Sequence, residues 1–470
     1  PPAYCGGKSV RRIISTMFKI YFHGGAQEVT GANYLLEKES AGKPTRILVD
    51  CGMFQCPRFC AARNRNDFPY DPASVDALFV THAHVDHVGR IPKLVRSGFR
   101  GAIYSTPPTK DFARLMLEDS LGILEKEAAH MGDKEAFYAM VDIEEAMKLW
   151  RGIPYNQSVT IGDAVATLHE AGHILGSAMV EINIDGKKVL FTGDFGNAPM
   201  PLLSPPDQVR GVHTLIIESA YGDRVHEDRD ERKLKLERAV EDVVRLRGTL
   251  MIPAFALERT QELIYELNDL VEHGRIPRIP VFIDSPLSIR ATEIYRRYES
   301  YFNRDALKII QEGDDLFQFP GLKLTLTAEE SKSINEVNGP KVILAGAGMM
   351  QGGRILHHAR RYLPDKNNMI MFIGYQAAGS LGRRIFDGEK QVNIFGEKVY
   401  VDAEVRSIHG YSAHADTNDL LNFIRANADT LQRVFVVQGE PAASFFLSQR
   451  ARDYLGLHAH VPRLGEVFTI

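Results

Sequence analysis

The sequence predicts an α/β protein with two domains, and three observations support this prediction. The chain has 470 residues, which is more than one hydrophobic core normally holds. Strand-like runs alternate with helical stretches along its whole length. After Asp194 the runs become apolar strands that each end in a turn and continue into a helix, a pattern typical of parallel βα units.

The part of the chain before Asp194 is expected to be rich in strands. The runs that indicate strands are FKIYFHGGAQEVTGANYLLE with an internal turn, TRILVDCG, GAIYSTP, VATLHEAGHILGSAMVEINI and KKVLFTGDFG. VDALFVTHAHVDHVG reads as a strand that runs into a loop and then into a helix through Val95. One long helical region is expected from Lys110 to Arg151.

The second domain is expected at residues 207–391. Its apolar strand-like runs are TLIIESAYG, GTLMIPAFAL, VFIDSPLS, KVILAGAGMM and MIMFIGYQ. The segment ERTQELIYELNDLVEHG between two of them carries apolar residues at helical spacing. Beyond residue 391 the chain returns to short strands with polar turns.

Composition indicates a globular chain. Apolar residues make up 44% and charged residues 25% of it, and no apolar run approaches the roughly 18 residues that span a bilayer. The formal net charge is −4, so RNA binding would need locally concentrated positive charge in a cleft. Four cysteines are too few for a disulfide framework and are typical of a reducing cytoplasm. Cys51, Cys56 and Cys60 match no standard zinc spacing, so buried thiols are favoured over a third metal site.

The segment THAHVDH, residues 81–87, is the clearest functional signal. His82 and His84 are two residues apart on extended chain, so both imidazoles are expected to face the same side. Asp86 and His87 follow where the chain turns into a helix. The segment therefore offers two imidazoles to one metal, and a carboxylate with an imidazole to a second metal.

A site for two metals also needs a distant histidine and a bridging carboxylate. His173 and Asp194, each near the end of an expected strand, supply them. Imidazole and carboxylate ligands of this kind suit zinc. Two zinc ions would lower the pKa of a bridging water and hold it as hydroxide, so the sequence predicts a hydrolase before any substrate is named.

Asp50, at the end of the run ILVDCG, is expected to lie behind the metal site. A carboxylate there could accept the N–H of a ligand histidine and so orient its ring. The alternative is an aspartate that only caps a turn.

The order H-x-H-x-D-H, then a single histidine and a single aspartate, resembles the metallo-β-lactamase superfamily. Later motifs are similar to those of the β-CASP nucleases, in particular the cleavage-and-polyadenylation endonuclease branch and its bacterial relatives. These motifs are IIESAYGDR, IPAFALERTQEL, DSPL, GAGMMQGG, GYQAAGSLGRR and GYSAHAD. The resemblance runs from about Phe18 to the C-terminus. It implies a metallo-β-lactamase αββα sandwich with an inserted β-CASP domain, and an RNA path in the cleft between them.

The same resemblance implies how the chain is divided. Residues 17–206 would form the first part of the lactamase domain, residues 207–391 the β-CASP domain, and residues 392–470 the C-terminal part of the lactamase domain. Residues 1–16 read as an extension or an expression remnant, and Met17 as a natural start. The chain would then be the minimal two-domain form, and a homodimer is a possible assembly.

The resemblance also assigns roles to Glu218 and His414. The family pairs the carboxylate at Glu218 with the histidine at His414, which serves as the general acid for the leaving 3′ oxygen. Physical reasoning agrees, because a glutamate that holds an imidazolium raises its pKa and fixes its direction. Together with Asp86, they are the expected catalytic residues. The alternative for His414 is a polar residue at a helix start.

The Gly-rich turn GYQAAGSLGRR is a candidate phosphate-binding site. Gly379 and Ser380 would offer backbone N–H groups and a hydroxyl, and Arg383 and Arg384 two guanidiniums near a helix start. The alternative is a Gly-rich turn with solvated arginines.

Gln438 is the main departure from the family pattern. Family members that act on RNA usually carry His-Gly-Glu at this motif, with the histidine on the second zinc, whereas this chain reads VVQGEPAA. An amide is a much poorer zinc ligand than an imidazole. Three outcomes are open: a weaker second metal, a water in its place, or a protein kept only for binding RNA.

The leading hypothesis is a zinc-dependent ribonuclease with two metals that acts on single-stranded RNA. It would cut internally and possibly also from the 5′ end, in the cytoplasm and away from any membrane. The alternatives are a DNA nuclease of the same fold, a catalytically silent RNA-binding subunit, and a small-molecule hydrolase. The βα-rich insertion with its Gly- and Arg-containing turn speaks against the small-molecule hydrolase, since small substrates need no long cationic groove.

Overall fold

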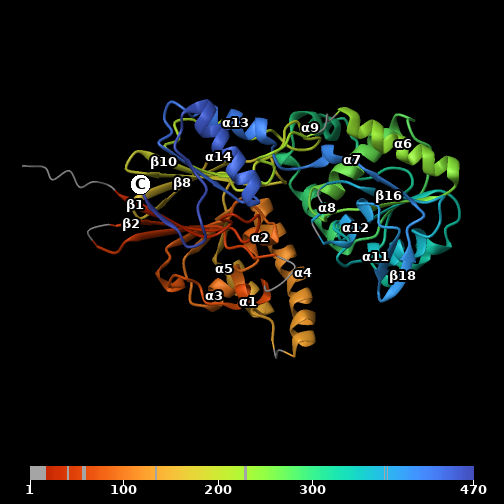
Figure 1. Cartoon of the computed structure of the whole chain (residues 1–470), viewed down its shortest axis with the longest axis horizontal. Coiled ribbons are helices and arrows are strands. Elements are labelled where there is room, and N and C mark those ends of the chain that lie inside the picture. Colours follow the sequence, from red (N-terminus) through yellow and green to blue (C-terminus); the bar gives the residue numbers. More distant parts are fainter. Residues whose placement is uncertain are drawn as a thin grey trace, which may run out of the picture.

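The computed structural model describes residues 17–39, 42–55, 60–132, 135–226, 230–374, 376–377 and 379–470. The expected extension, residues 1–16, lies outside them. Figure 1 shows two lobes. Elements from both ends of the sequence build one lobe, and helices α6 to α12 with their strands build the other. The expected α/β fold with an inserted domain is therefore confirmed.

The first lobe contains two seven-stranded sheets, and the first of them has the order β22-β1-β2-β3-β4-β5-β6. Its strands are β1 (Phe18–Gly24), β2 (Asn33–Lys38), β3 (Thr45–Val49), β4 (Ala77–Phe79), β5 (Ala102–Ser105), β6 (Trp150–Gly152) and β22 (Val467–Thr469). Strands β22 to β3 pair antiparallel, and β3 to β6 pair parallel. The carboxyl ends of β3 and β4 therefore meet at one edge, where the THAHVDH segment begins.

The second sheet has the order β21-β20-β11-β10-β9-β8-β7. Its strands are β7 (Ser158–Ile161), β8 (Ala164–Glu170), β9 (Ala178–Ile184), β10 (Lys187–Phe191), β11 (Thr214–Glu218), β20 (Arg433–Val437) and β21 (Ala459–His460). Strands β10, β11, β20 and β21 pair parallel. Strand β11 falls inside residues 207–391, the range expected for the inserted domain, yet its apolar residues lie in this sheet.

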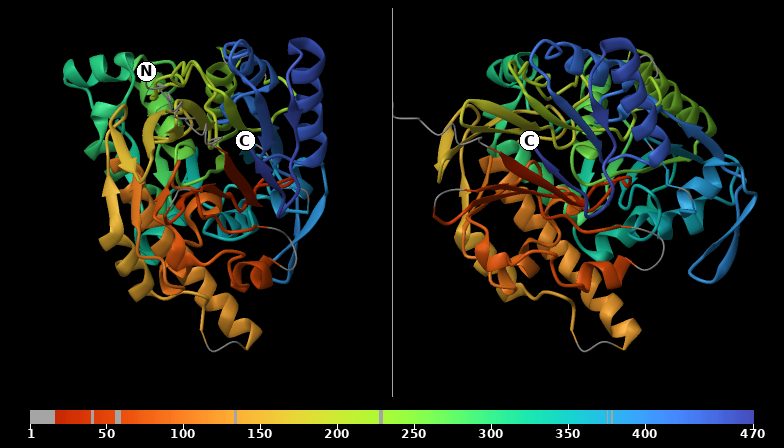
Figure 2. Two further views of the ribbon diagram at one scale, coloured as in Figure 1. Left: turned by 90° about the vertical axis from the view of Figure 1, so that its left-hand side faces the viewer. Right: turned by 60° about the vertical axis from the view of Figure 1, so that its left-hand side comes forward.

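The two sheets pack face to face around an apolar layer (Figure 2). Strand β1 alternates buried and half-buried residues, so Phe22 points into this layer, where its ring lies 5.1 Å from that of Phe435. A fully buried phenylalanine stabilises the fold by roughly 1.5–3 kcal/mol relative to an exposed one. Truncating Phe435 to alanine would cost about 3–5 kcal/mol.

Helices cover the outer face of each sheet (Figures 1 and 2). The helices beside the first sheet are α1 (Cys60–Arg65), α2 (Val85–Val88), α3 (Ile91–Arg96), α4 (Pro107–Met131) and α5 (Met140–Leu149), and those on the second are α13 (Thr417–Arg425) and α14 (Pro441–Leu455). The expected helical region from Lys110 to Arg151 contains two helices, α4 and α5, and ends in the short strand β6. Gly132 has a φ of 76° and ends α4 in a left-handed cap.

The second lobe contains a six-stranded sheet of order β14-β13-β15-β12-β16-β19, in which all neighbours are parallel. Its strands are β12 (Thr249–Pro253), β13 (Val281–Ile283), β14 (Leu322–Leu324), β15 (Lys341–Ala345), β16 (Met369–Phe372) and β19 (Glu404–Ser407). Its helices are α6 (Asp230–Leu246), α7 (Arg259–Glu272), α8 (Pro286–Arg297), α9 (Arg304–Gln311), α10 (Ala328–Ser333), α11 (Ile355–Tyr362) and α12 (Leu381–Phe386), and β17 (Gln391–Ile394) and β18 (Glu397–Tyr400) form a hairpin. Four of its strands, β12, β13, β15 and β16, correspond to runs that the sequence predicts as strands of parallel βα units. Strand β19 lies beyond residue 391 and closes the sheet before the chain returns to the first lobe.

Two expectations from composition can be compared with the structure. In the described ranges, no helix combines the length and apolar character needed to cross a bilayer. Cys51 is a buried free thiol, as expected, whereas Cys60 is disulfide-bonded, so the expected thiol there is wrong. Cys56 lies outside the described residues.

Candidate metal centre

Asp50 and Thr81 form the base of the site. They follow the paired strands β3 and β4, and the Asp50 carboxylate accepts hydrogen bonds from the Thr81 amide and the Thr81 hydroxyl, both at 2.8 Å. Its Oδ2 also lies 2.7 Å from Nδ1 of His87. Asp50 is fully buried, so these contacts satisfy a charge that water cannot reach. The arrangement corresponds to the expected role of Asp50 behind a histidine, rather than to a simple turn cap.

Gly52 lets the chain beyond Asp50 pass against the THAHVDH segment. A Cβ at Gly52 would lie 1.5 Å from the Asp86 carbonyl oxygen, so no other residue fits. This contact holds the loop that carries Asp86 and His87 close to the end of β3.

Three histidines and one aspartate converge on one point, which we call the first position. His82 Nε2 lies 3.0 Å from His84 Nδ1, and His84 Nδ1 lies 3.3 Å from His173 Nε2. Asp194 Oδ2 lies 3.3 Å from His82 Nε2 and 3.5 Å from His173 Nε2. These four atoms all lie within 4.8 Å of one another.

The spacing of the first position fits a tetrahedral metal. Zinc bonds of about 2.0–2.1 Å place neighbouring ligand atoms roughly 3.3 Å apart, which matches the observed separations. Burial, together with neighbouring histidines, lowers the pKa of His84 and of His173 well below the usual value. Both rings are therefore neutral, the form that binds metals. Four lone pairs aimed at one buried point would be costly without a cation between them.

The remaining expected ligands lie on the other side of Asp194, in what we call the second position. Asp194 Oδ1 lies 3.3 Å from His87 Nε2, so its two oxygens face the two positions. Asp86 Oδ2 is farther away, 4.0 Å from His87 Nε2. The THAHVDH segment thus places His82 and His84 at the first position, and His87 with Asp86 on the other side of Asp194.

Gln438 lies at the second position. It follows β20 with its backbone N–H bonded to the Gly25 carbonyl at 2.7 Å, and its side chain is buried. Its amide nitrogen lies 2.9 Å from His87 Nε2 and 2.9 Å from Asp194 Oδ1. The residue that departs from the family pattern therefore contacts both atoms that a second metal would need.

His414 and Glu218 lie beside the first position. His414 Nδ1 lies 3.0 and 3.2 Å from the two Glu218 oxygens, and its ring lies 4.6 Å from that of His173. Glu218 is fully buried at the end of β11, and its Oε1 also accepts the Phe195 N–H at 2.5 Å. The segment that carries His414 pairs with the chain just after Asp194, through a bridge between His414 and Gly196.

The environment of His414 favours its protonated form. Burial alone would lower the pKa of His414, but the charges of Glu218 and Asp194 and the hydrogen bond that His414 donates to Glu218 outweigh it and raise the pKa to about 9. The side chain is 25% exposed. An imidazolium held by Glu218 and partly open to solvent can donate a proton to a bound molecule.

Glu258 joins the two lobes behind the metal centre, a contact that the sequence did not predict. It lies just before α7, and its Oε2 accepts the Leu175 N–H at 3.2 Å, two residues beyond His173. The Tyr295 hydroxyl donates to the same carboxylate. Burial and the nearby Glu262 raise the pKa of Glu258 to about 8. The sequence signal that could have indicated this contact is Glu258, a glutamate that directly follows the apolar run IPAFAL.

The expected phosphate-binding turn uses its polar groups internally. The Ser380 hydroxyl caps α12 by accepting the Arg383 N–H at 3.1 Å and donates to the Ala377 carbonyl at 2.8 Å. Arg383 pairs with Asp387, and Arg384 with Glu389. Gly379 has a φ of 82°, which glycine adopts most easily. These contacts correspond to the alternative of a structural turn, and phosphate binding there stays a prediction.

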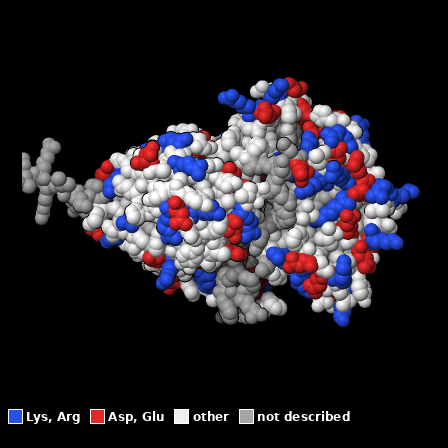
Figure 3. Space-filling model, turned by 45° about the horizontal axis from the view of Figure 1, so that its top comes forward, with Lys and Arg blue, Asp and Glu red and all other residues white. Residues whose placement is uncertain are grey.

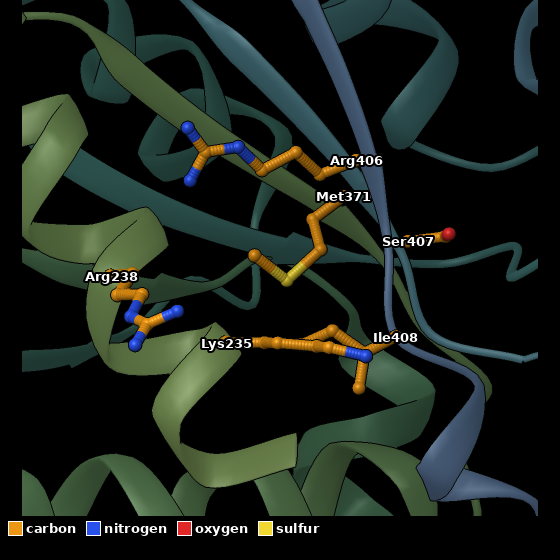
Figure 4. Close-up of a pocket in the computed structure, with 6 residues that line it drawn as sticks. All are labelled: Lys235, Arg238, Met371, Arg406, Ser407 and Ile408. Carbon is orange, nitrogen blue, oxygen red and sulfur yellow. The ribbon is translucent and has the colours of Figure 1, made fainter. Parts of the chain in front are cut away.

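A cationic hollow of about 240 Å³ lies on the second lobe next to the strand that leads to His414 (Figure 4). Lys235 and Arg238 extend into it from α6, and Arg406 from β19. Lys235 pairs with Glu231, and Arg406 pairs with Asp242 and Glu404, but Arg238 makes no hydrogen bond or ion pair within the described part of the chain. On the face shown in Figure 3, basic and acidic side chains are intermixed. The hollow is the kind of local positive charge that the net charge of −4 requires for RNA binding.

Three family models match successive parts of the chain. They are the Metallo-beta-lactamase superfamily at residues 30–254, the Beta-Casp domain at residues 260–385, and the Zn-dependent metallo-hydrolase RNA specificity domain at residues 398–462. A solved structure titled "Crystal Structure of a Protein of Unknown Function from Enterococcus faecalis V583" superposes with a TM-score of 0.57. It covers 97% of this chain and 100% of the other at 12% identity, so this likeness concerns the fold alone.

Curated relatives are similar over nearly the whole chain. Ribonuclease TTHA0252 of Thermus thermophilus is 38% identical over 89% of this chain and 92% of its own length. Transcription termination factor FttA of Methanocaldococcus jannaschii is 33% identical over 94% of this chain and 70% of its own length. These relatives and the three family models show that the chain is a metal-dependent hydrolase and that it belongs to the β-CASP family of the metallo-β-lactamase superfamily.

Proposed function

We propose that this protein is a zinc-dependent ribonuclease that hydrolyses phosphodiester bonds of single-stranded RNA. The observation that carries the proposal is the first position, where four buried ligand atoms converge beside the His414–Glu218 pair. Two relationships support RNA as the substrate. One relative is named a ribonuclease, and the RNA specificity domain model matches residues 398–462, which include His414.

The chemistry divides between the metal and the chain's own residues. Zinc held by His82, His84, His173 and Asp194 would need a water molecule as a further ligand, and it would lower the pKa of that water enough to make it a nucleophile near neutral pH. Glu218 holds Nδ1 of His414, so Nε2 is the nitrogen left to give a proton to the leaving 3′ oxygen. Cleavage of this kind leaves a 5′-phosphate and a 3′-hydroxyl.

The RNA path is proposed to pass the cationic hollow. Lys235, Arg238 and Arg406 would contact backbone phosphates there, and β19 continues from the hollow through a turn of 3-10 helix, His409–Tyr411, to His414. Whether the protein cuts internally, from the 5′ end, or both depends on how far the strand extends past this hollow. An RNA substrate also supports the proposed cytoplasmic location.

A silent RNA-binding protein is the second candidate, and the position of Gln438 favours it. If catalysis required a metal at the second position, the amide found there would weaken or abolish it. The first position and the His414–Glu218 pair both favour an active enzyme, because a protein that only binds RNA has no need for a proton donor beside a metal site.

Metal depletion and RNA cleavage test these functions together. The full chain is stripped with a chelator, restored with zinc, and incubated with 5′-labelled single-stranded RNA and DNA of the same sequence. We expect RNA cleavage only after zinc is restored, with product lengths that report internal or terminal cutting. DNA cleavage at an equal rate would support the DNA nuclease instead. RNA binding without cleavage would support the silent protein.

A further inference from the structure

We propose that Gln438 occupies the second metal position itself, so that this chain holds a single divalent cation, at the first position. The inference rests on the metal centre of the proposed function and narrows it from two metals to one. It is carried by the contacts of one buried amide, which are independent of any metal.

The orientation of the Gln438 amide follows from its neighbours. Asp194 Oδ1 is a carboxylate oxygen and can only accept a hydrogen bond, so the amide atom 2.9 Å away must be the nitrogen. The same nitrogen lies 2.9 Å from His87 Nε2. The amide therefore contacts both Asp194 Oδ1 and His87 Nε2, two atoms that a metal at the second position would bind.

Asp50 fixes the ring of His87 in this contact. Nδ1 of His87 lies 2.7 Å from Oδ2 of the buried Asp50 carboxylate, so Nε2 is the nitrogen turned towards the second position. The amide nitrogen of Gln438 lies 2.9 Å from Nε2, and an amide N–H group cannot bind a metal. With the amide in this place, His87 Nε2 contacts Gln438 instead of a cation.

The side chain of Gln438 is held where it lies. It is 2% exposed, and the residue has a φ of 48° at the end of β20 with its N–H bonded to the Gly25 carbonyl. A Cβ placed on Gly25 would lie 3.0 Å from the Gln438 Cγ, so the backbone at Gly25 packs directly against the glutamine. Moving the Gln438 side chain out of the second position would break its hydrogen bond to Asp194 and its contact with His87, both of which are buried.

The contacts of the Gln438 amide do not involve the ligand atoms of the first position. These atoms are His82 Nε2, His84 Nδ1, His173 Nε2 and the other oxygen of Asp194. The amide contacts Asp194 through Oδ1, whereas Oδ2 faces the first position. Gln438 therefore acts as a neutral stand-in for the second cation: its amide contacts Asp194 Oδ1 and His87 Nε2, while the ligand atoms of the first position stay in place.

Counting metals in matched variants tests the inference. The wild-type chain and the variants Gln438→His, Gln438→Glu and Gln432→His are loaded with excess zinc, passed over a chelating resin and analysed for bound zinc. Gln438→Glu keeps the side-chain shape but replaces the donor with a ligand. Gln432→His makes the same exchange as Gln438→His at an exposed residue just before β20 and serves as the control.

We expect one zinc per chain in the wild type and in Gln432→His, and two in Gln438→His and Gln438→Glu. Two zinc ions in the wild type would overturn the inference and leave the proposed ribonuclease intact. One zinc in both Gln438 variants, with wild-type unfolding temperatures, would also overturn it, since the amide would then not be what closes the position. No zinc in the wild type would overturn the metal centre on which both proposals rest.

Discussion

The two metal positions share Asp194 but differ in what completes them. Around the first position, imidazole nitrogens and a carboxylate oxygen all present lone pairs and leave the centre open. At the second position, the amide nitrogen of Gln438 lies 2.9 Å from both His87 Nε2 and Asp194 Oδ1. The comparison teaches that the ligands of the THAHVDH segment do not by themselves fix the number of metals, because one neighbouring amide can contact the same ligand atoms.

Removing a ligand of the first position should have the largest effect. His84→Ala deletes one of three histidines, so we expect bound zinc to fall from one per chain to none. Cleavage should slow by more than roughly 10³-fold, because ordinary water has a pKa near 16 and is a poor nucleophile. Metal analysis and RNA cleavage measure the two effects, with the exposed His130→Ala as the control. Zinc retained at one per chain in His84→Ala would contradict the first position.

Removing the proposed acid should separate catalysis from metal binding. His414→Ala leaves all four ligands of the first position in place, so zinc content should stay at one per chain. The rate of RNA cleavage should fall by about 10²–10⁴-fold, the usual contribution of a positioned acid. Single-turnover cleavage of 5′-labelled RNA measures it. Cleavage at the wild-type rate would show that another group protonates the leaving oxygen.

The architecture and the local part of the site could be predicted because their signals are short in sequence. Apolar runs that end in turns identified the strands β12, β13, β15 and β16, and THAHVDH placed two ligands on extended chain by its spacing alone. The sequence of a strand does not determine which sheet the strand joins. β11 is as apolar as the strands that follow it, but it pairs with β10 and β20 in the first lobe, because strand pairing depends on the whole topology.

The state of Gln438 could not be predicted, although its identity marked it as unusual. Its effect depends on contacts with His87 and Asp194, which lie 351 and 244 residues away in the sequence. Arg383 and Arg384 also depend on their neighbours. Their ion pairs with Asp387 and Glu389 could not be predicted from the turn motif, and phosphate binding there stays a prediction.

A smaller effect is expected at the cationic hollow, away from both metal positions. Arg238→Ala should weaken RNA binding severalfold and reduce the slope of log affinity against log salt by about 0.7, the value for one phosphate contact on a single strand. Fluorescence anisotropy with labelled RNA at several salt concentrations measures both. Arg245→Ala is the matched control on α6, because that guanidinium already pairs with Asp242. Equal salt slopes for the two variants would place the RNA path elsewhere.

The smallest expected effect sharpens the comparison most. Asp86→Asn keeps the side-chain shape but removes the charge that a second cation would need. Asp86 is not among the ligands of the first position, and it lies 4.0 Å from His87 Nε2, where Gln438 already provides the donor. Zinc content should therefore stay at one per chain, and zinc affinity measured against a competing chelator should change less than about twofold, below the 10–100-fold loss seen when groups that support a metal are removed. In Gln438→His the same Asp86→Asn exchange should lower the count from two towards one. An Asp86 that matters only when residue 438 is a ligand would show that the glutamine alone separates a one-metal centre from a two-metal centre.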